Sequence, residues 1–82
     1  MDETAIYAAL TEIFHHLFDD PALVLTAETN ADDVAGWDSL KCVLILVAVE
    51  ERFAIRFHTT EIDELKSVGD LVQLIKKKSA RP

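Results

Sequence analysis

Eight apolar residues, Cys42 to Val49, follow one another without a break and most restrict the fold of this 82-residue chain. Their valine and isoleucine content would suit a buried strand. The flanks favour a helix instead, because Asp38 and Ser39 are good N-cap residues and no helix breaker occurs before Phe53. A length of about 15 residues is ordinary for a helix and long for a strand. We therefore expect one helix over residues 39–53.

The other segments also favour helices. Residues 3–18 have the apolar spacing of an amphipathic helix. A threonine at 59–60 is expected to cap a brief helix, TEIDEL, and Ser67 and Asp70 have the spacing of a capping box before a last helix. The apolar positions of these three helices are Ile6, Leu10, Ile13, Phe14, Leu17, Ile62, Leu65, Val68, Leu71, Val72 and Ile75.

The connection over residues 19–37 is long for so small a domain and shows no sustained periodicity. Such loops are usually functional or packed by their own apolar side chains. With only 2 Gly and 2 Pro in the chain, we predict an all-α fold over residues 1–82, a single domain with a frayed tail from about residue 79. The residues expected to hold the loop on the core are Leu23, Val24, Leu25 and Val34.

The formal net charge is −7, from 15 acidic and 8 basic side chains. This charge opposes binding to nucleic acid or to an anionic membrane, so we expect neither partner. One cysteine excludes an intramolecular disulfide and fits a reducing compartment. The first ten residues lack the pattern of a secretion signal, and no apolar run has membrane-spanning length. We expect a cytoplasmic monomer whose charged partners are basic protein surfaces.

The 39–53 helix cannot be buried on every side in so small a domain. At about 100° per residue its apolar residues form two stripes. One stripe is expected to face the core, and the other either meets a partner or is covered by the first helix or the long loop. The core stripe is Val43, Leu46, Val49 and Phe53, and the second is Leu40, Leu44 and Val47.

Two good cap residues stand side by side at the start of this helix, and one is sufficient. If Asp38 caps, the hydroxyl of Ser39 is free at the positive end of the helix dipole. Free N–H groups and the dipole would both favour a phosphoryl group esterified there. Simple capping by Ser39 is the alternative.

The chain resembles the acyl carrier protein and peptidyl carrier protein family over about residues 4–78. The resemblance implies a four-helix bundle of acyl-carrier type, with three longer helices, one short helix and a long first loop. The stretches that carry it are GWDSL at 36–40, Val43, EERF at 50–53 and SVGDLV at 67–72.

The resemblance also implies a carrier function. In the family the serine that matches Ser39 is esterified with 4′-phosphopantetheine, which a phosphopantetheinyl transferase moves from coenzyme A with magnesium. The thiol of this arm holds an acyl or aminoacyl group as a thioester for loading and downstream biosynthetic enzymes. Asp38 matches the motif aspartate and presents the serine, and Leu40 matches the motif leucine, which contacts the transferase.

The residues after the motif depart from typical fatty-acid carriers. Lys41 and Leu44 stand where acids are common, and Arg52 replaces a frequent acid. A more apolar docking face predicts a specialised pathway with dedicated partners, while Glu61, Asp63 and Glu64 preserve long-range acidic attraction. The residues predicted to dock partners are Trp37, Lys41, Leu44, Val47, Glu50, Glu51 and Ile62.

The carrier function has two alternatives. A small hydrolase would need a base, and the sequence places no histidine near Ser39 and no G-x-S-x-G elbow around it, so we predict no enzyme. A helical protein–protein interaction module that is never loaded is the alternative to the carrier.

The remaining candidate residues favour structural roles. Trp37 is expected to pin the loop end to the core, with a partner anchor as the alternative. Cys42 is expected to be a buried small hydrophobe. His15 and His16 lack the i, i+4 spacing of a helical zinc pair, and with His58 they are expected on the surface or rim, so no metal site is predicted.

Overall fold

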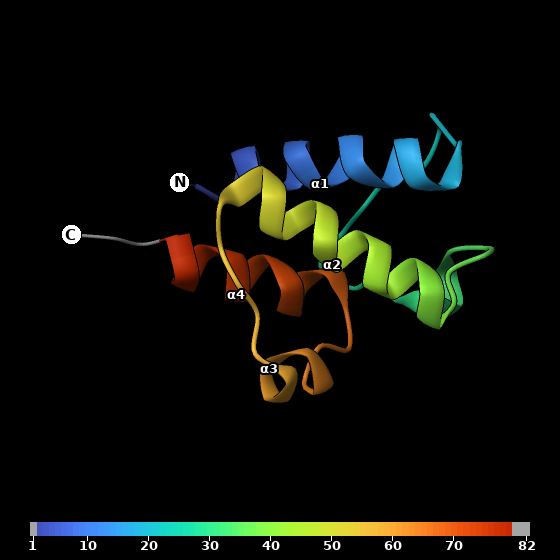
Figure 1. Cartoon of the computed structure of the whole chain (residues 1–82). Helices are drawn as coiled ribbons and strands as arrows, with labels where there is room; N and C mark the ends of the chain where they lie inside the picture. Colours follow the sequence, from blue (N-terminus) through green and yellow to red (C-terminus); the bar gives the residue numbers. More distant parts are fainter. Residues whose placement is uncertain (1, 80–82) are drawn as a thin grey trace.

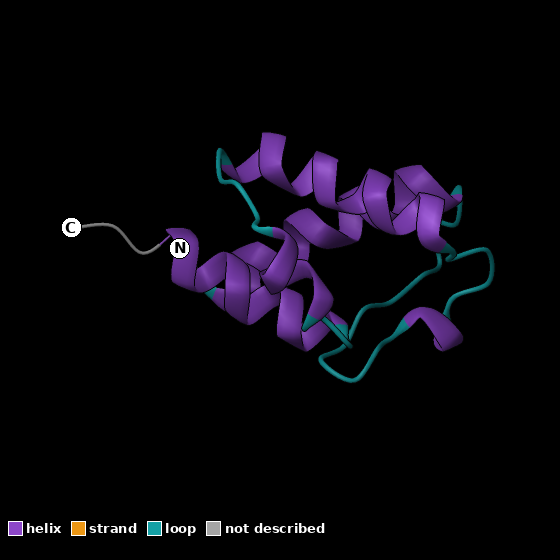
Figure 2. Cartoon of the chain, turned by 60° about the horizontal axis from the view of Figure 1, so that its bottom comes forward, coloured by secondary structure: helices purple, strands orange, loops and turns teal. Residues whose placement is uncertain are grey.

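The computed structural model describes residues 2–79, and it confirms the all-α fold with three longer helices and one short helix (Figures 1 and 2). No strand occurs among these residues, and none of their helices is both long and apolar enough to cross a membrane. The elements are α1 (Glu3–Phe18), the 3-10 turn η1 (Ala31–Asp33), α2 (Ser39–Phe53), α3 (Thr59–Asp63) and α4 (Val68–Ser79).

The core lies where α1 meets α2 and α4, while α3 sits at the edge of the bundle (Figure 1). Each long helix turns an apolar stripe inward, as burial of apolar area requires. All four positions predicted for α4 are buried. The core residues are Ile6, Leu10, Phe14, Leu25, Ile45, Leu46, Val49, Ile55, Val68, Leu71, Val72 and Ile75.

The orientation of α2 differs from the prediction at one position. Val43 was expected in the core and is 55% exposed, whereas Ile45 is buried. Cys42 lies at the middle of the inward arc, and Val43 is about 100° further round the helix, so it joins the outer stripe. The exposed α2 face, as we call it, consists of Leu40, Val43, Leu44 and Val47, which are 39–66% exposed.

The long loop is held on the bundle by side chains and by backbone. Leu25 and Val34 are buried as predicted, but Val24 is 74% exposed, so its predicted contact with the core is wrong. The amide of Val68 donates to the carbonyl of Thr29 at 2.7 Å. Thr29 is itself buried, and its hydroxyl accepts a 2.9 Å bond from the amide of Thr26. The loop thereby supplies acceptors to the first turn of α4.

The helix ends follow the predicted chemistry with two shifts. Ser67 Oγ accepts from the Asp70 amide at 3.3 Å, but the Asp70 carboxylate accepts from the amide of Lys66 instead of Ser67. For α3 the predicted threonine cap is wrong: His58 is the N-cap residue, because Glu61 already reaches its amide at 2.8 Å. In the predicted frayed tail, residue 79 is still helical and residues 80–82 lie outside the described residues.

Candidate functional site

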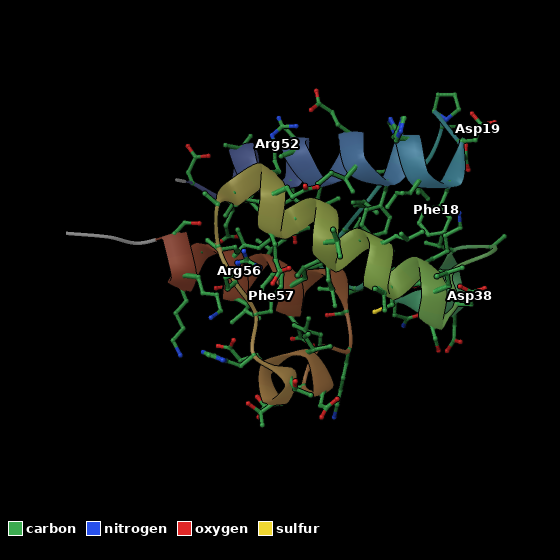
Figure 3. The ribbon with its side chains drawn as sticks, in the orientation of Figure 1. Phe18, Asp19, Asp38, Arg52, Arg56 and Phe57 are labelled. Atoms are coloured by element: carbon green, nitrogen blue, oxygen red, sulfur yellow. The ribbon has the colours of Figure 1, made fainter. Side chains whose placement is uncertain are left out.

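The start of α2 presents a free hydroxyl. Asp38 has extended backbone geometry, and its Oδ1 accepts a 2.9 Å hydrogen bond from the amide of Lys41, so Asp38 is the cap (Figure 3). Ser39 is therefore the first helical residue, and it is exposed. Within residues 2–79 no hydrogen bond engages Ser39 Oγ. The alternative in which Ser39 itself caps the helix is not what the structure shows.

The electrostatics at this hydroxyl favour an anion. The first turn of α2 contains no acidic residue, so the positive end of its dipole is opposed only by the Asp38 cap. Amides of a helix start and the dipole together stabilise phosphate groups. In the described part of the chain no histidine or carboxylate is hydrogen-bonded to Ser39. The geometry suits a modified serine.

An open, largely apolar cavity of about 360 Å³ begins beside Ser39. One wall is the first half of α2, with Cys42 and Leu46, and the opposite wall is the 65–71 segment. A second hollow, of about 320 Å³, runs along α2 from the same serine past Val47 to Ile62. Two apolar spaces therefore meet at Ser39.

Trp37 packs against the hydrophobic core of the bundle. It is half-buried, and its ring meets that of Phe14 edge-on, with 5.2 Å between centroids. The centroid of the Phe18 ring lies 6.3 Å from that of the Trp37 ring. Edge-to-face pairs of this kind add stabilisation beyond the buried area. This packing agrees with the pinning role predicted for Trp37.

Two of the predicted docking residues are engaged in contacts within the chain. Lys41 Nζ donates a 3.0 Å bond to the carbonyl of Leu17, at the end of α1, and lies 5.6 Å from the centre of the Phe18 ring. Glu50 Oε2 accepts a 2.9 Å bond from the amide of Phe57, in the connection after α2. Both charges are thus tied to the fold. Their neighbour Glu51 is exposed.

The other polar candidates hold structural positions. His15 Nε2 lies 2.7 Å from the carbonyl of Leu23 and ties α1 to the long loop, while His16 and His58 are exposed. Cys42 is half-buried and free. No cluster of metal-ligating side chains occurs in residues 2–79.

Sequence reasoning missed one residue of the exposed α2 face. Val43 stands three residues after Leu40 and four before Val47, which places it on the outer stripe by helical spacing. The same residue is also three before Leu46, and this second relation led to the core assignment. The spacing of Val43 therefore fits both the inner and the outer stripe, and only packing decides between them.

Known proteins agree with this geometry. A family model for the phosphopantetheine attachment site matches residues 8–75. The acyl carrier protein of Acidothermus cellulolyticus is 33% identical over 75 residues, which cover 92% of this chain and 89% of that protein. This chain belongs to the acyl carrier protein family.

Two further proteins are similar to this chain. A putative mitochondrial acyl carrier protein of Schizosaccharomyces pombe is 41% identical over 58 residues, or 71% of this chain, and the chain spans about half (51%) of that protein. The solution structure of holo acyl carrier protein from Geobacter metallireducens is 46% identical, with a TM-score of 0.83 over 88% of this chain and 83% of that one.

Membership of the acyl carrier protein family means that this chain is a carrier and not an enzyme, with a covalent phosphopantetheine as its prosthetic group. When bound, that group supplies a thiol that holds an acyl group as a thioester. The residues present fit it: an exposed hydroxyl without a protein partner stands at a helix start with no acidic first-turn residue, beside apolar space. Proteins of this family interact with biosynthetic enzymes.

Proposed function

We propose that Ser39 is the attachment point of the 4′-phosphopantetheine arm and that the chain delivers acyl or aminoacyl thioesters to the enzymes of a specialised biosynthetic pathway. The observation that carries this proposal is the exposed Ser39 hydroxyl at the start of α2, left free because Asp38 takes the cap. The family match over residues 8–75 includes this position.

The neighbours of Ser39 have distinct parts in this proposal. Asp38 fixes the first turn of α2 and so holds the serine at a constant angle for the phosphopantetheinyl transferase. Leu40 is 66% exposed directly after it, which makes it an apolar contact for that enzyme. Trp37 supports the turn from behind through its packing on Phe14.

The exposed α2 face is the proposed docking surface for the transferase and for loading and downstream enzymes. Four apolar side chains in a row on a helix of a small protein usually mark an interaction site. Leu44 and Val47 form its centre, Ile62 borders it from α3, and Glu51 supplies a charge at its end. Lys41 and Glu50 contribute to this surface indirectly. Their hydrogen bonds to Leu17 and Phe57 fix the position of α2 relative to α1 and to the connection that follows α2.

A specialised pathway is proposed because the contact is apolar. Partners of an acidic helix would need a basic patch, whereas partners of this helix need an apolar surface of matching shape. The net charge of −7 still attracts basic surfaces at long range and opposes self-association, which supports a monomer. A single cysteine supports a reducing compartment, and we place the carrier in the cytoplasm.

Intact-mass analysis tests the attachment. The protein is incubated with coenzyme A, magnesium and a broad-specificity phosphopantetheinyl transferase, and we expect a gain of one phosphopantetheinyl group. Ser39→Ala should remove the gain, whereas Ser67→Ala, at the start of α4, should keep it. No gain with several transferases would instead favour the unloaded interaction module, and a gain that persists in Ser39→Ala would place the arm elsewhere.

A further inference from the structure

The carbonyl of Leu17, near the end of α1, has no partner within its own helix. In a continuing helix this oxygen would accept from the amide four residues on, but that residue is Pro21, which has no N–H. The chain leaves the helix at Asp19, whose left-handed backbone closes the end by donating to the carbonyl of His15. The Leu17 carbonyl therefore needs a donor from another segment.

That donor comes from the first turn of α2. Lys41 Nζ donates to the Leu17 carbonyl at 3.0 Å and lies over the Phe18 ring, 5.6 Å from its centre. The ammonium thus lies at the negative end of the α1 dipole and on an aromatic face, and both contacts favour a cation. Lys41 is half-buried. Its charge is used within the fold and is not offered to a partner.

Lys41 also belongs to the turn that carries Ser39. Its amide donates to the Asp38 carboxylate at 2.9 Å, and the next amide, that of Cys42, donates to the Asp38 carbonyl at 2.9 Å. These two bonds hold the turn together from within. The side chain of Lys41 then ties the turn to α1.

This tie also sets the direction of the Ser39 side chain. Ser39 precedes Lys41 by two residues, so the two side chains lie about 200° apart around the helix. Lys41 reaches toward α1, while Ser39 is exposed. Rotation of the turn about the helix axis would move both side chains together, so a fixed ammonium fixes the direction of Ser39 Oγ. Phe18 and Asp38 lie at the same end of the bundle (Figure 3), so the tie acts where the hydroxyl is presented.

We propose that Lys41 is a positioning residue for the loading of Ser39: its ammonium, held on the end of α1, fixes the rotation of the first turn of α2 and so aims the Ser39 hydroxyl for the transferase. This inference rests on the proposed function. In the loading step the Ser39 oxygen bonds to the phosphorus next to pantetheine, the pyrophosphate bond of coenzyme A breaks, the adenosine bisphosphate part leaves and the hydroxyl proton is released. A small misplacement of a reacting oxygen slows such a step.

Steady-state kinetics of the transferase test this role, with the carrier as the varied substrate and with coenzyme A and magnesium in excess. Lys41→Met keeps the apolar stem and removes the donor. We expect kcat to fall roughly three- to tenfold and KM for the carrier to stay within about twofold of the wild-type value. Lys41→Arg keeps a cation that can donate to the Leu17 carbonyl and should recover most of kcat. A docking charge would instead change KM, and its effect would shrink in high salt.

Arg52→Met is the matched control. Arg52 makes a second side-chain link between α2 and α1, a 3.1 Å ion pair with Glu12, and it lies at the opposite end of α2 from Ser39 (Figure 3). This variant removes one cation from the same pair of helices and should keep the wild-type kcat. An equal fall in both variants would contradict the proposal, because it would show that loosened packing between α1 and α2 limits loading.

Hydrogen exchange of the unmodified chain tests the tie without the transferase. The reporter is the amide of Cys42, which is bonded to the Asp38 carbonyl. In Lys41→Met its protection, taken relative to the intrinsic exchange rate, should fall roughly two- to fivefold, and in Arg52→Met it should not change. A lower kcat with unchanged Cys42 protection would overturn the proposal, since Lys41 would then contact the transferase directly.

The failure of this proposal can be told apart from the failure of the proposed function. If the wild-type chain is loaded and Lys41→Met keeps its kcat, or changes only in KM, the positioning role fails and the proposed function stands. If the wild-type chain is not loaded, the proposed function fails, and the role of Lys41 in loading fails with it. The protection of the Cys42 amide would then still show whether Lys41 ties α2 to α1.

Discussion

The amide of Gly69 donates a 3.0 Å hydrogen bond to the carbonyl of Ala27, so the first turn of α4 lies directly against the long loop. With the bond from Val68 to Thr29, this contact supplies acceptors to two amides that a helix start leaves unpaired. An irregular loop thus stabilises α4, a helix that contributes four side chains to the core. The absence of a side chain at position 69 makes this approach possible.

We expect Gly69→Ala to lower the free energy of unfolding by about 1–2 kcal/mol. Alanine is the better helix former by about 1 kcal/mol, which alone would stabilise α4. However, an added Cβ would lie 2.8 Å from the carbonyl oxygen of Ala27, and a backbone atom cannot turn aside as a side chain does. Urea unfolding measures the change. Lys77→Ala, on the exposed side of α4, should be nearly neutral, and a stabilised Gly69→Ala would show that the loop yields.

The helices were predictable because their signals are local. Asp38 is a good N-cap residue and no helix breaker follows it before Phe53, so the start and end of α2 follow from neighbours in sequence. In α4 likewise, the apolar residues form a single stripe, so the side of the helix that faces the core follows from the sequence. Val43 was not predictable, since its spacing fits both the inner and the outer stripe, and the choice depends on which side meets α1.

Contacts between distant segments were also beyond the sequence. Lys41 reaches a carbonyl 24 residues away, and Glu50 reaches an amide 7 residues away. As sequence positions they resemble surface charges on a docking helix. Their long side chains instead bind backbone groups of neighbouring segments near the two ends of α2, and no periodicity in the sequence indicates this. The free hydroxyl of Ser39, by contrast, was one of the two arrangements that the adjacent cap residues allowed, and the cap bond of Asp38 selects it.

Asp38→Ala should cost about 1 kcal/mol of stability, because the N-cap bond to Lys41 is lost. Asp38→Asn should cost only a few tenths, since asparagine caps equally well. Urea unfolding gives the stabilities, and the rate of mass gain with the transferase gives the loading. If Asp38 acts by positioning Ser39, loading should follow the cap and recover in Asp38→Asn. Slow loading in both variants would instead show that the transferase reads the carboxylate itself.

Glu61 makes the fold sensitive to acid. The hydrogen bond from the His58 backbone, and then the bond from Lys78, lower the pKa of Glu61 below its ordinary value of 4.5. A carboxylate with a lowered pKa in the folded state stabilises it above the unfolded pKa. That contribution is lost as the pH falls through the folded value, because the unfolded chain binds the proton first.

We therefore expect the urea midpoint of Glu61→Gln to fall less steeply than that of the wild type between about pH 5 and pH 3. Some acid dependence should persist in the variant. Lys76 and Gln73 also lower the pKa of Glu3 by hydrogen bonding. Parallel curves for the two proteins would mean that Glu61 titrates alike in the folded and unfolded states.

A substitution on the exposed α2 face should weaken recognition by partner enzymes without unfolding the domain. Leu44 is 39% exposed, so Leu44→Glu removes little core packing and should change the unfolding free energy by no more than about 1 kcal/mol. A hot-spot residue near the centre of an interface contributes a factor of about ten or more to affinity. We expect kcat/KM of the enzymes that use the carrier to fall at least about tenfold.

Val24→Glu is the matched control for Leu44→Glu. Val24 is 74% exposed on the long loop, so the variant adds the same charge to another surface and should leave kcat/KM near the wild-type value. An equal fall in both variants would assign the effect to net charge, which acts on any basic partner at a distance. A large drop in melting temperature for Leu44→Glu would place Leu44 in the core. Loss of use in Leu44→Glu alone, with an unchanged melting temperature, identifies a docking surface, because both variants add the same charge and only one of them places it on the exposed α2 face.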